Sequence, residues 1–293
     1  MGTGVNPVED KIKPSPTDLK SPDFVFSQGS LQAYADCPRL FQLRYLQRVP
    51  WPAPEVEPNL ENERTLRLGS VFHKLVQQFL IGIPAERLEG ISNQDPQLSK
   101  WWTNFIRHHP ELESRAKHFE ITLSTHLDDY RLLAKYDLIL QQEEKILIYD
   151  WKTNRKLIQP RWLAPKLQSR VYPFVLVKAG ADLFNGMMID PERVEMVYWF
   201  SNHPTTPVRL PYSNRQYQED GEYIRGLISR ISSQVGNEFP LTENVKRCDY
   251  CVYRSLCDRG VTAGAFENYE EMFDVGDDEA IDLDFEQIAE IEF

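Results

Sequence analysis

Long hydrophobic runs are missing from this chain of 293 residues. No window holds eighteen consecutive apolar residues, so no membrane-spanning helix is expected. The N-terminus lacks the basic-then-apolar order of a secretory signal, and we therefore expect a cytosolic protein that does not act at a membrane. A Gly-x4-Gly-Lys-Ser/Thr phosphate loop is also absent, so an ATP-driven motor would have to be another polypeptide. The length suffices for one large domain or two small ones, with a substantial core.

Cysteine is scarce, because the chain has only Cys37, Cys248, Cys251 and Cys257. In a cytosolic protein such close spacing indicates metal binding before disulfide bonds. A Cys-x2-Cys pair with two further thiolates suits a structural zinc ion. A metal shared by Cys37 and the three later cysteines would tie the first helix to the C-terminal end of the fold.

Basic residues are absent after Arg259, whereas residues 261–293 carry twelve acids. This acidic tail accounts for the formal net charge of −11, since residues 1–260 hold 32 acids against 33 bases. The scattered apolar residues of the tail leave two interpretations open, a solubilising disordered segment and one that docks. Within the body, residues 151–178 contain seven bases and no acid. We interpret this stretch, with Arg155 and Lys156 in it, as a candidate phosphate-contacting surface.

Periodicity predicts one domain over residues 26–260, between a disordered arm at 1–25 and the acidic tail at 261–293. Pro38 is expected to divide the first helix, so that Cys37 lies where two helical pieces meet. Pro173 is expected to kink a later helix or to mark its start. A linker is expected over 50–58, which holds four prolines, and a loop over 82–99. Helices are predicted over 27–45, 68–81, 101–107, 165–178 and 214–235, and strands over 117–125, 130–137, 145–150 and 194–200.

The residues Asp150-Trp-Lys152 end a short apolar run and precede the basic stretch. Because side chains alternate along a strand, Asp150 and Lys152 are expected to point the same way. Asp137 ends the preceding strand, and a predicted hairpin turn over 141–145 brings it close to Asp150. An acid and a lysine on one face can hold a divalent metal beside an anionic oxygen. A surface ion pair is the competing interpretation, since acid-x-Lys is frequent by chance.

Other candidate side chains lie at helical spacing. His73 stands beside the apolar stripe of the second predicted helix, near its N-terminal end. A histidine in this position is either a packing residue or a metal ligand. Gln168 and Tyr172 are four residues apart and therefore share a helix face. Trp151, Trp162 and Tyr172 interleave with the bases of the basic stretch, where they either stack nucleic-acid bases or belong to the core.

Together these patterns resemble the PD-(D/E)xK superfamily, and within it the RecB-like nucleases of the iron–sulfur type. That type includes the CRISPR-associated RecB-like exonucleases and the nuclease domain of AddB. The resemblance runs from about Ser27 to Asp258, in the motif order of the family. Two positions depart from it, because Ala134 stands where glycine is common and Pro173 directly follows Tyr172. The matching motifs are Ser27-Gln-Gly-Ser-Leu with Cys37-Pro38-Arg39 and Phe41, Gly69-x3-His73, Asp137, Asp150-x-Lys152, Gln168-x3-Tyr172 and Cys248-x2-Cys251-x5-Cys257.

The resemblance implies an α/β fold, a restriction-endonuclease-like core with a mixed sheet flanked by helices. It implies that Lys152 orients the attacking water or stabilises charge on the scissile phosphate, and that Gln168 and Tyr172 contact the substrate or brace the site. Glu120 would lie near the site on the first core strand. The implied ligands of Mg²⁺ or Mn²⁺ are His73, Asp137, Asp150 and the backbone carbonyl of Trp151. A histidine ligand favours Mn²⁺ somewhat.

The resemblance also implies a [4Fe-4S] cluster on Cys37, Cys248, Cys251 and Cys257, with zinc as the alternative. The expected activity is that of a divalent-metal-dependent DNA nuclease, an exonuclease on single-stranded DNA or DNA ends, in DNA repair or CRISPR adaptation. Two rival hypotheses stay open. One is a DNA-end-binding adaptor that has lost turnover, and the other is an assembly subunit that partners a helicase or an integrase.

Overall fold

The computed structural model describes residues 19–21, 24–49, 59–109 and 116–260. Most of the predicted N-terminal arm, the proline-rich linker at 50–58 and the acidic tail at 261–293 lie outside these ranges. Leu19 and Phe24, which the prediction assigned to the disordered arm, are buried in the core. The prediction was therefore wrong for these residues, because their apolar side chains pack despite their Pro- and Ser-rich surroundings.

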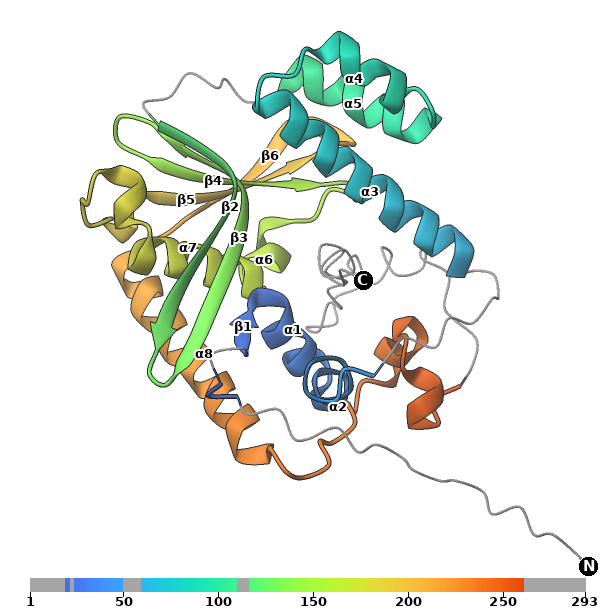
Figure 1. The fold of residues 1–293 in the computed structure, drawn as a ribbon, viewed down its shortest axis with the longest axis vertical. Helices are drawn as coiled ribbons and strands as arrows, with labels where there is room; N and C mark the ends of the chain where they lie inside the picture. The colour runs from blue at the N-terminus through green and yellow to red at the C-terminus, as the bar shows by residue number, and fades with distance from the viewer. Residues whose placement is uncertain (1–18, 22–23, 50–58, 110–115, 261–293) are drawn as a thin grey trace, which may run out of the picture.

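A six-stranded mixed sheet forms the centre of the fold (Figure 1). Its order is β1-β3-β4-β5-β6, and β2 pairs with the other edge of β3. The pairs β1–β3 and β4–β5 are parallel, and the pairs β2–β3, β3–β4 and β5–β6 are antiparallel. The strands are β1 (Val25–Ser27), β2 (Ala116–Leu127), β3 (Tyr130–Gln141), β4 (Ile146–Lys152), β5 (Val194–Phe200) and β6 (His203–Pro211).

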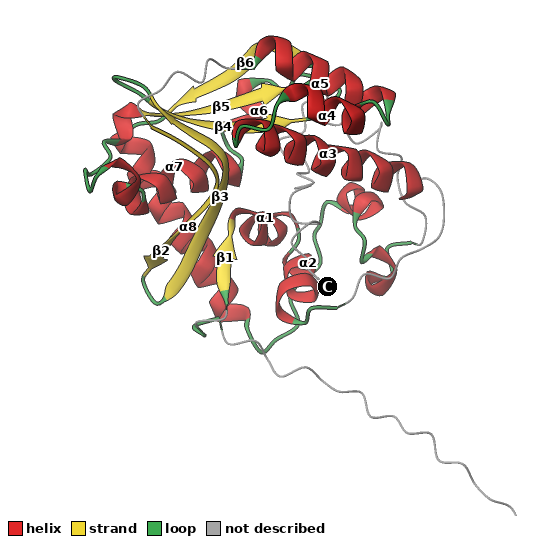
Figure 2. Cartoon of the chain, turned by 45° about the horizontal axis from the view of Figure 1, so that its top comes forward, coloured by secondary structure: helices red, strands yellow, loops and turns green. Residues whose placement is uncertain are grey.

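Helices cover both faces of the sheet (Figure 2). One face packs on α1 (Gln28–Asp36), α7 (Leu167–Ala179) and α8 (Asn214–Gln234), and the other on α3 (Asn59–Leu80), α4 (Ala85–Ser92) and α5 (Pro96–His108). The short helices are α2 (Pro38–Phe41), the π-helix η1 (Gln42–Leu46), α6 (Pro160–Leu163) and the 3₁₀ helices η2 (Ala181–Phe184), η3 (Pro191–Arg193), η4 (Val245–Tyr250) and η5 (Arg254–Cys257). Because both faces are covered, the apolar run of β4 is buried throughout. The prediction of an α/β mixed sheet flanked by helices is confirmed. In the described ranges, no helix is long and apolar enough to span a membrane.

Several predicted boundaries need correction. The expected loop at 82–99 contains α4 and the start of α5, whose first turn is capped by the Asp95 carboxylate. The sequence Asp95-Pro96 is a recognisable helix start that the prediction missed. Helix α3 begins nine residues earlier than expected, and the strands β1 and β6 were not predicted. Helix α7 continues through Pro173, so it does not start there.

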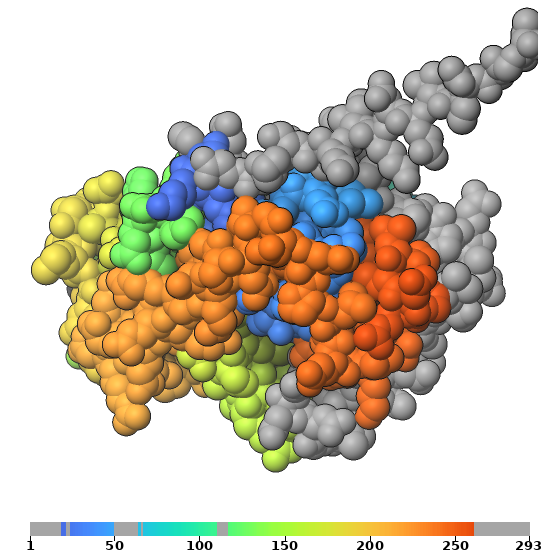
Figure 3. Space-filling view, turned by 90° about the horizontal axis from the view of Figure 1, so that it is seen from below, coloured from blue at the N-terminus to red at the C-terminus, as the bar shows by residue number. Residues whose placement is uncertain are grey.

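The first and last parts of the described chain lie side by side (Figure 3). Helix α1 ends at Asp36, Cys37 is extended, and α2 starts at Pro38, which confirms the predicted break. The Gln42 amide donates to the carbonyl of Asn237 at 2.7 Å and accepts from the amide of Phe239. The N-terminal helices are therefore joined to the segment after α8 by polar contacts as well as by the core.

Candidate active site

The predicted pair on β4 shares one face at the end of that strand. The ammonium of Lys152 lies 3.0 Å from Oδ2 of Asp150. Asp150 is 1% exposed, so this is not the surface ion pair of the competing interpretation. The strand ends at Lys152, where the sheet gives way to the loop that carries Arg155 and Lys156.

A single side chain of α7 fixes both members of the pair. The Gln168 amide donates through Nε2 to Oδ1 of Asp150 at 2.6 Å, and its Oε1 accepts from Lys152 Nζ at 2.9 Å. Gln168 is 4% exposed. Its amide nitrogen is a donor that suits the carboxylate, and its amide oxygen is an acceptor that suits the ammonium. The structure therefore brings Gln168 together with Asp150 and Lys152 in one buried network.

Asp137 reaches the same place from β3. Its Oδ2 accepts the backbone N–H of Trp151 at 2.9 Å, beyond Leu138 and Tyr149, the last residues that pair between β3 and β4 at this end. Its Oδ1 lies 3.4 Å from Nδ1 of His73 on α3. A Cβ atom at Gly69 would come to 3.4 Å from Thr153 Oγ1, an ordinary van der Waals distance, so α3 lies close to the loop after β4 at this residue.

Glu120 on β2 stands opposite Asp137, because the flanking pairs are Phe119 with Leu138 and Ile121 with Tyr136. Its φ of 50° is in the left-handed region, which is strained for a residue with a side chain. Burial, followed by the charge of Asp137, raises the pKa of its carboxyl above the ordinary value. Glu120 is thus electrostatically linked to Asp137.

The two central carboxyl groups differ in their electrostatics. Burial raises the pKa of Asp150 from 3.8 to about 6, and repulsion by Asp137 adds to this against the opposing effect of Lys152. Burial by itself would raise the pKa of Asp137. The charge and hydrogen bond of His73, the N–H of Trp151 and the charge of Lys152 lower it by more, so this pKa lies below the ordinary value. Two buried carboxyl groups this close favour a nearby cation.

The donor set suits a hard divalent ion, because two carboxylates and an imidazole converge. Oδ2 of Asp150 is buried and makes no hydrogen bond, although the Lys152 ammonium is its ion-pair partner. Within the described ranges, no group of three or more His, Cys, Asp or Glu side chains forms a ready-made metal site. The residues therefore fit a divalent ion in kind, while Asp150 is engaged with Lys152 and Gln168.

The remaining predicted residues lie at different depths. Trp151 is 2% exposed and packs in the core with Phe105 and Trp199. Tyr172 is 4% exposed, and its carbonyl accepts a hydrogen bond from the hydroxyl of Tyr136. For these two aromatics the core interpretation holds. Arg155 and Lys156 are exposed in the loop beyond Lys152, where a phosphate backbone can reach them.

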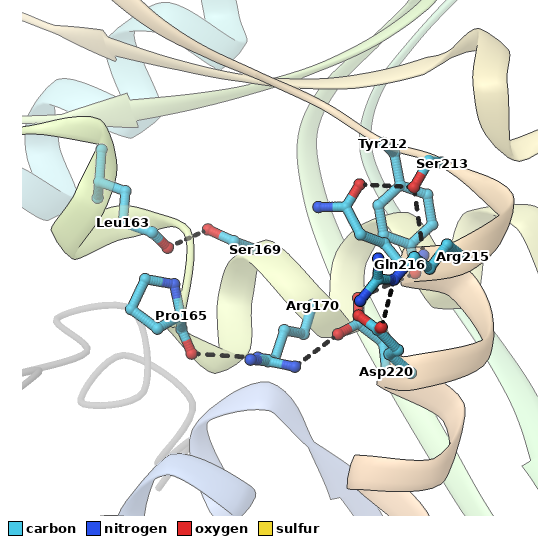
Figure 4. A network of polar contacts seen from close by, with 10 residues as sticks. Leu163, Pro165, Ser169, Arg170, Tyr212, Ser213, Arg215, Gln216 and Asp220 are labelled. Carbon is cyan, nitrogen blue, oxygen red and sulfur yellow. Dashed lines mark hydrogen bonds and ion pairs between the residues drawn. The ribbon is translucent and has the colours of Figure 1, made fainter.

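One base of the basic stretch has an internal partner that the local sequence does not reveal. Arg170 donates to Oδ1 of Asp220 at 2.8 Å, and the Tyr212 hydroxyl donates to the other carboxylate oxygen at 3.0 Å (Figure 4). The side chain of Asp220 is 6% exposed. Arg170 is therefore part of the packing between α7 and α8, and the interpretation of the whole stretch as a phosphate-contacting surface is wrong at this position.

The four cysteines are free thiols at the junction of the two chain ends. Burial, with a smaller contribution from the neighbouring Cys37 and Cys257 thiols, raises the pKa of Cys251 to about 11. The pKa of Cys248 is likewise raised, first by burial and then by Cys37 and Cys257. Within the part of the chain that the structure describes, these thiols do not form a ready-made metal site.

Comparisons with known proteins identify one family and two similar solved structures. The model of the family described as the PD-(D/E)XK nuclease superfamily matches residues 25–258. A crystal structure of a candidate exonuclease from Eubacterium rectale is 10% identical, with 82% of this chain and 89% of that chain covered and a TM-score of 0.49. A crystal structure of the protein SSO0001 is 14% identical, with 69% and 98% covered and a TM-score of 0.31. No curated protein matches the chain.

Proposed function

The chain belongs to the PD-(D/E)XK nuclease superfamily, and from this premise we propose that it is a divalent-metal-dependent exonuclease acting on single-stranded DNA or DNA ends. The observation that carries the proposal is that Asp137 of β3, Asp150 and Lys152 of β4, and Gln168 of α7 meet at one place. Superfamily membership supports a hydrolase with a nucleic-acid substrate. DNA repair and CRISPR adaptation are the two settings proposed for it, with a helicase or an integrase as partner.

The divalent ion, Mg²⁺ or Mn²⁺, would be held by His73, Asp137, Asp150 and the Trp151 carbonyl, and when bound it supplies a nucleophile at neutral pH and neutralises phosphate charge. Lys152 places a positive charge beside the same carboxylate, where it stabilises charge that develops on the scissile phosphate. Gln168 bonds both Lys152 and Asp150 and so fixes their positions relative to each other, which favours a bracing role over substrate contact. Arg155 and Lys156 follow on the exposed side and are proposed to contact the phosphate backbone.

We further propose that Cys37, Cys248, Cys251 and Cys257 hold a [4Fe-4S] cluster, with a zinc ion as the alternative. Support comes from their free thiols at the junction of α1, α2 and the C-terminal segment. The cluster would stabilise the joint that Gln42 makes with residues 237–239.

The test is cleavage of end-labelled single-stranded DNA with Mg²⁺, with Mn²⁺ and with a chelator. We expect wild-type protein to cleave only with metal, and Lys152→Ala to lose at least a hundredfold in rate, because one preorganised charge contributes about that much. Lys100→Ala, at an exposed lysine of α5 outside the basic stretch, is the matched control and should keep the wild-type rate. Equal rates for Lys152→Ala and Lys100→Ala would refute the site. Tight binding without metal-dependent cleavage by the wild type would favour the adaptor hypothesis.

A further inference from the structure

A pocket of about 280 Å³ lies beside the N-terminal end of α7. Its walls come from α1, α6, α7, α8 and residues 242–247, so it stands at the joint between the nuclease core and the cysteine-bearing segment. None of the proposed metal ligands lines it. The volume is just below the range of about 300–1,000 Å³ usual for ligand pockets, and therefore suits one small group.

The lining combines aromatic rings with neutral polar groups. Trp162 and Tyr223 contribute the rings, and Gln32, Thr242 and Asn244 contribute amides and a hydroxyl. Trp162 is partly exposed, whereas Trp151 and Tyr172 of the same basic stretch are buried in the core. Of these three aromatics, Trp162 is thus the one placed to stack on a ligand. Rings for stacking and amides for hydrogen bonds are the recognition chemistry of a nucleobase.

The charges of the lining cancel. Arg247 is paired with Asp36, which also accepts from the Gln32 amide, and Glu243 and Lys166 contribute one charge of each sign. A phosphate would gain little from such a surface, whereas a flat neutral group loses little on entering it. The guanidinium of Arg161 lies 5.2 Å from the centre of the Trp162 ring, where it adds a positive charge beside the pocket. The balance favours a base inside and its phosphates outside.

The pocket adjoins the candidate active site through one turn of α7. Leu167 lines the pocket, and its N–H donates to Oε1 of Gln32 at 3.4 Å. The next residue, Gln168, bonds Asp150 and Lys152. Because Leu167 and Gln168 are consecutive residues, the pocket and the carboxylates both border the first turn of α7.

The wall beside α7 is held rigidly. Arg170 donates through Nε to the carbonyl of Pro165 at 3.3 Å and bonds Asp220 (Figure 4). Its guanidinium also stacks 4.7 Å from the ring centre of Tyr223. Pro165 and Tyr223 both line the pocket, so the network fixes two of its walls before any ligand binds.

We propose that this pocket is a subsite for one nucleobase of single-stranded DNA, with Trp162 as its stacking platform and Gln32 and Asn244 at the hydrogen-bonding edge. The inference rests on the proposed function, because the strand that enters the pocket is the strand that is cut. It goes beyond that function by assigning a base-reading position to a surface separate from the metal ligands.

The experiment scans single-stranded DNA in which one abasic nucleotide is moved stepwise from the end. Wild-type protein should lose about tenfold in kcat/KM at one position, because stacking of one base contributes about 1–3 kcal/mol. Ala35→Phe places a ring at the exposed rim and should lower kcat/KM on intact DNA by a similar factor while removing the sensitivity to that position. Ala164→Phe makes the same change at an exposed alanine outside the lining and should behave as wild type.

Binding of the same oligonucleotides in a chelator, measured by fluorescence anisotropy, separates the subsite from the proposed activity. An affinity loss at one abasic position that disappears in Ala35→Phe supports the subsite even for a protein that does not cleave DNA. Uniform cleavage and uniform affinity across all abasic positions would overturn the subsite and leave the nuclease proposal intact. A circular dichroism spectrum of each variant verifies folding, and Trp162→Leu replaces Ala35→Phe if the latter misfolds.

Discussion

Replacing the central carboxylate should stabilise the metal-free protein while abolishing its proposed activity. Asp150 is 1% exposed and stands beside a second carboxyl group, Asp137, so its charged form is disfavoured in the folded state. Asp150→Asn removes the charge and keeps the shape, and its amide oxygen can still accept from Gln168. Its amide nitrogen then faces the Lys152 ammonium in place of Oδ2, so the gain derived from the pKa is an upper bound. A group kept for function at the expense of stability is the expected pattern at an active site.

The magnitude follows from the pKa of Asp150, which burial raises from 3.8 to about 6 in the fold. At about 1.4 kcal/mol per pKa unit, the neutral isostere should gain about 3 kcal/mol in free energy of unfolding above pH 6. Because the folded pKa lies above the unfolded one, wild-type stability falls as pH rises between these two values. The gain of Asp150→Asn should therefore be complete at pH 8, shrink to about 1 kcal/mol at pH 4.5, and vanish at lower pH.

The assay is urea unfolding of both proteins in a chelator at pH 8 and pH 4.5, followed by a cleavage assay with Mn²⁺. Asp182→Asn makes the same chemical change at an exposed carboxyl and should alter stability by less than about 0.5 kcal/mol. A loss of stability for Asp150→Asn at pH 8, or an equal gain at both pH values, would show that the carboxylate is not electrostatically strained. Wild-type cleavage by this variant would remove Asp150 from the active site.

Three further predictions concern other parts of the chain. Asp220→Ala should lower the free energy of unfolding by about 3 kcal/mol because it leaves Arg170 without its buried partner. A double-mutant cycle of Asp220→Ala with Arg170→Met should show a coupling energy above about 1 kcal/mol. The control Lys178→Met should change stability by less than about 0.5 kcal/mol. Replacement of any one cysteine by alanine should lower iron content and soluble yield, and elemental analysis that finds zinc without iron in anaerobically purified wild-type protein would reject the iron–sulfur proposal. A chain that ends at Gly260 should bind single-stranded DNA more tightly than the full chain, most at low salt, if the acidic tail competes with phosphates; equal affinities at two salt concentrations would exclude that competition.

The parts of the site that were predictable are those set by short sequence spacing. Alternation along β4 placed Asp150 and Lys152 on one face, and the hairpin at 141–145 brought Asp137 near them. The helix break at Pro38 was equally local, since a proline cannot continue the preceding turn. The missed elements had weaker local signals. The helix α4 has a narrow apolar face, and the strand β6 contains prolines and is exposed over most of its length.

The sequence by itself determined where the chemistry-bearing residues stand on their own elements, because strand and helix periods are properties of neighbouring residues. Only the tertiary structure decided which of them meet. Packing of α3 and α7 on opposite faces of the sheet brought His73 to Asp137 and placed Gln168 between Asp150 and Lys152. The same packing paired Arg170, whose side chain stays partly exposed, with an acid fifty residues away on α8. These contacts depend on how distant elements dock, and no spacing within the chain encodes them.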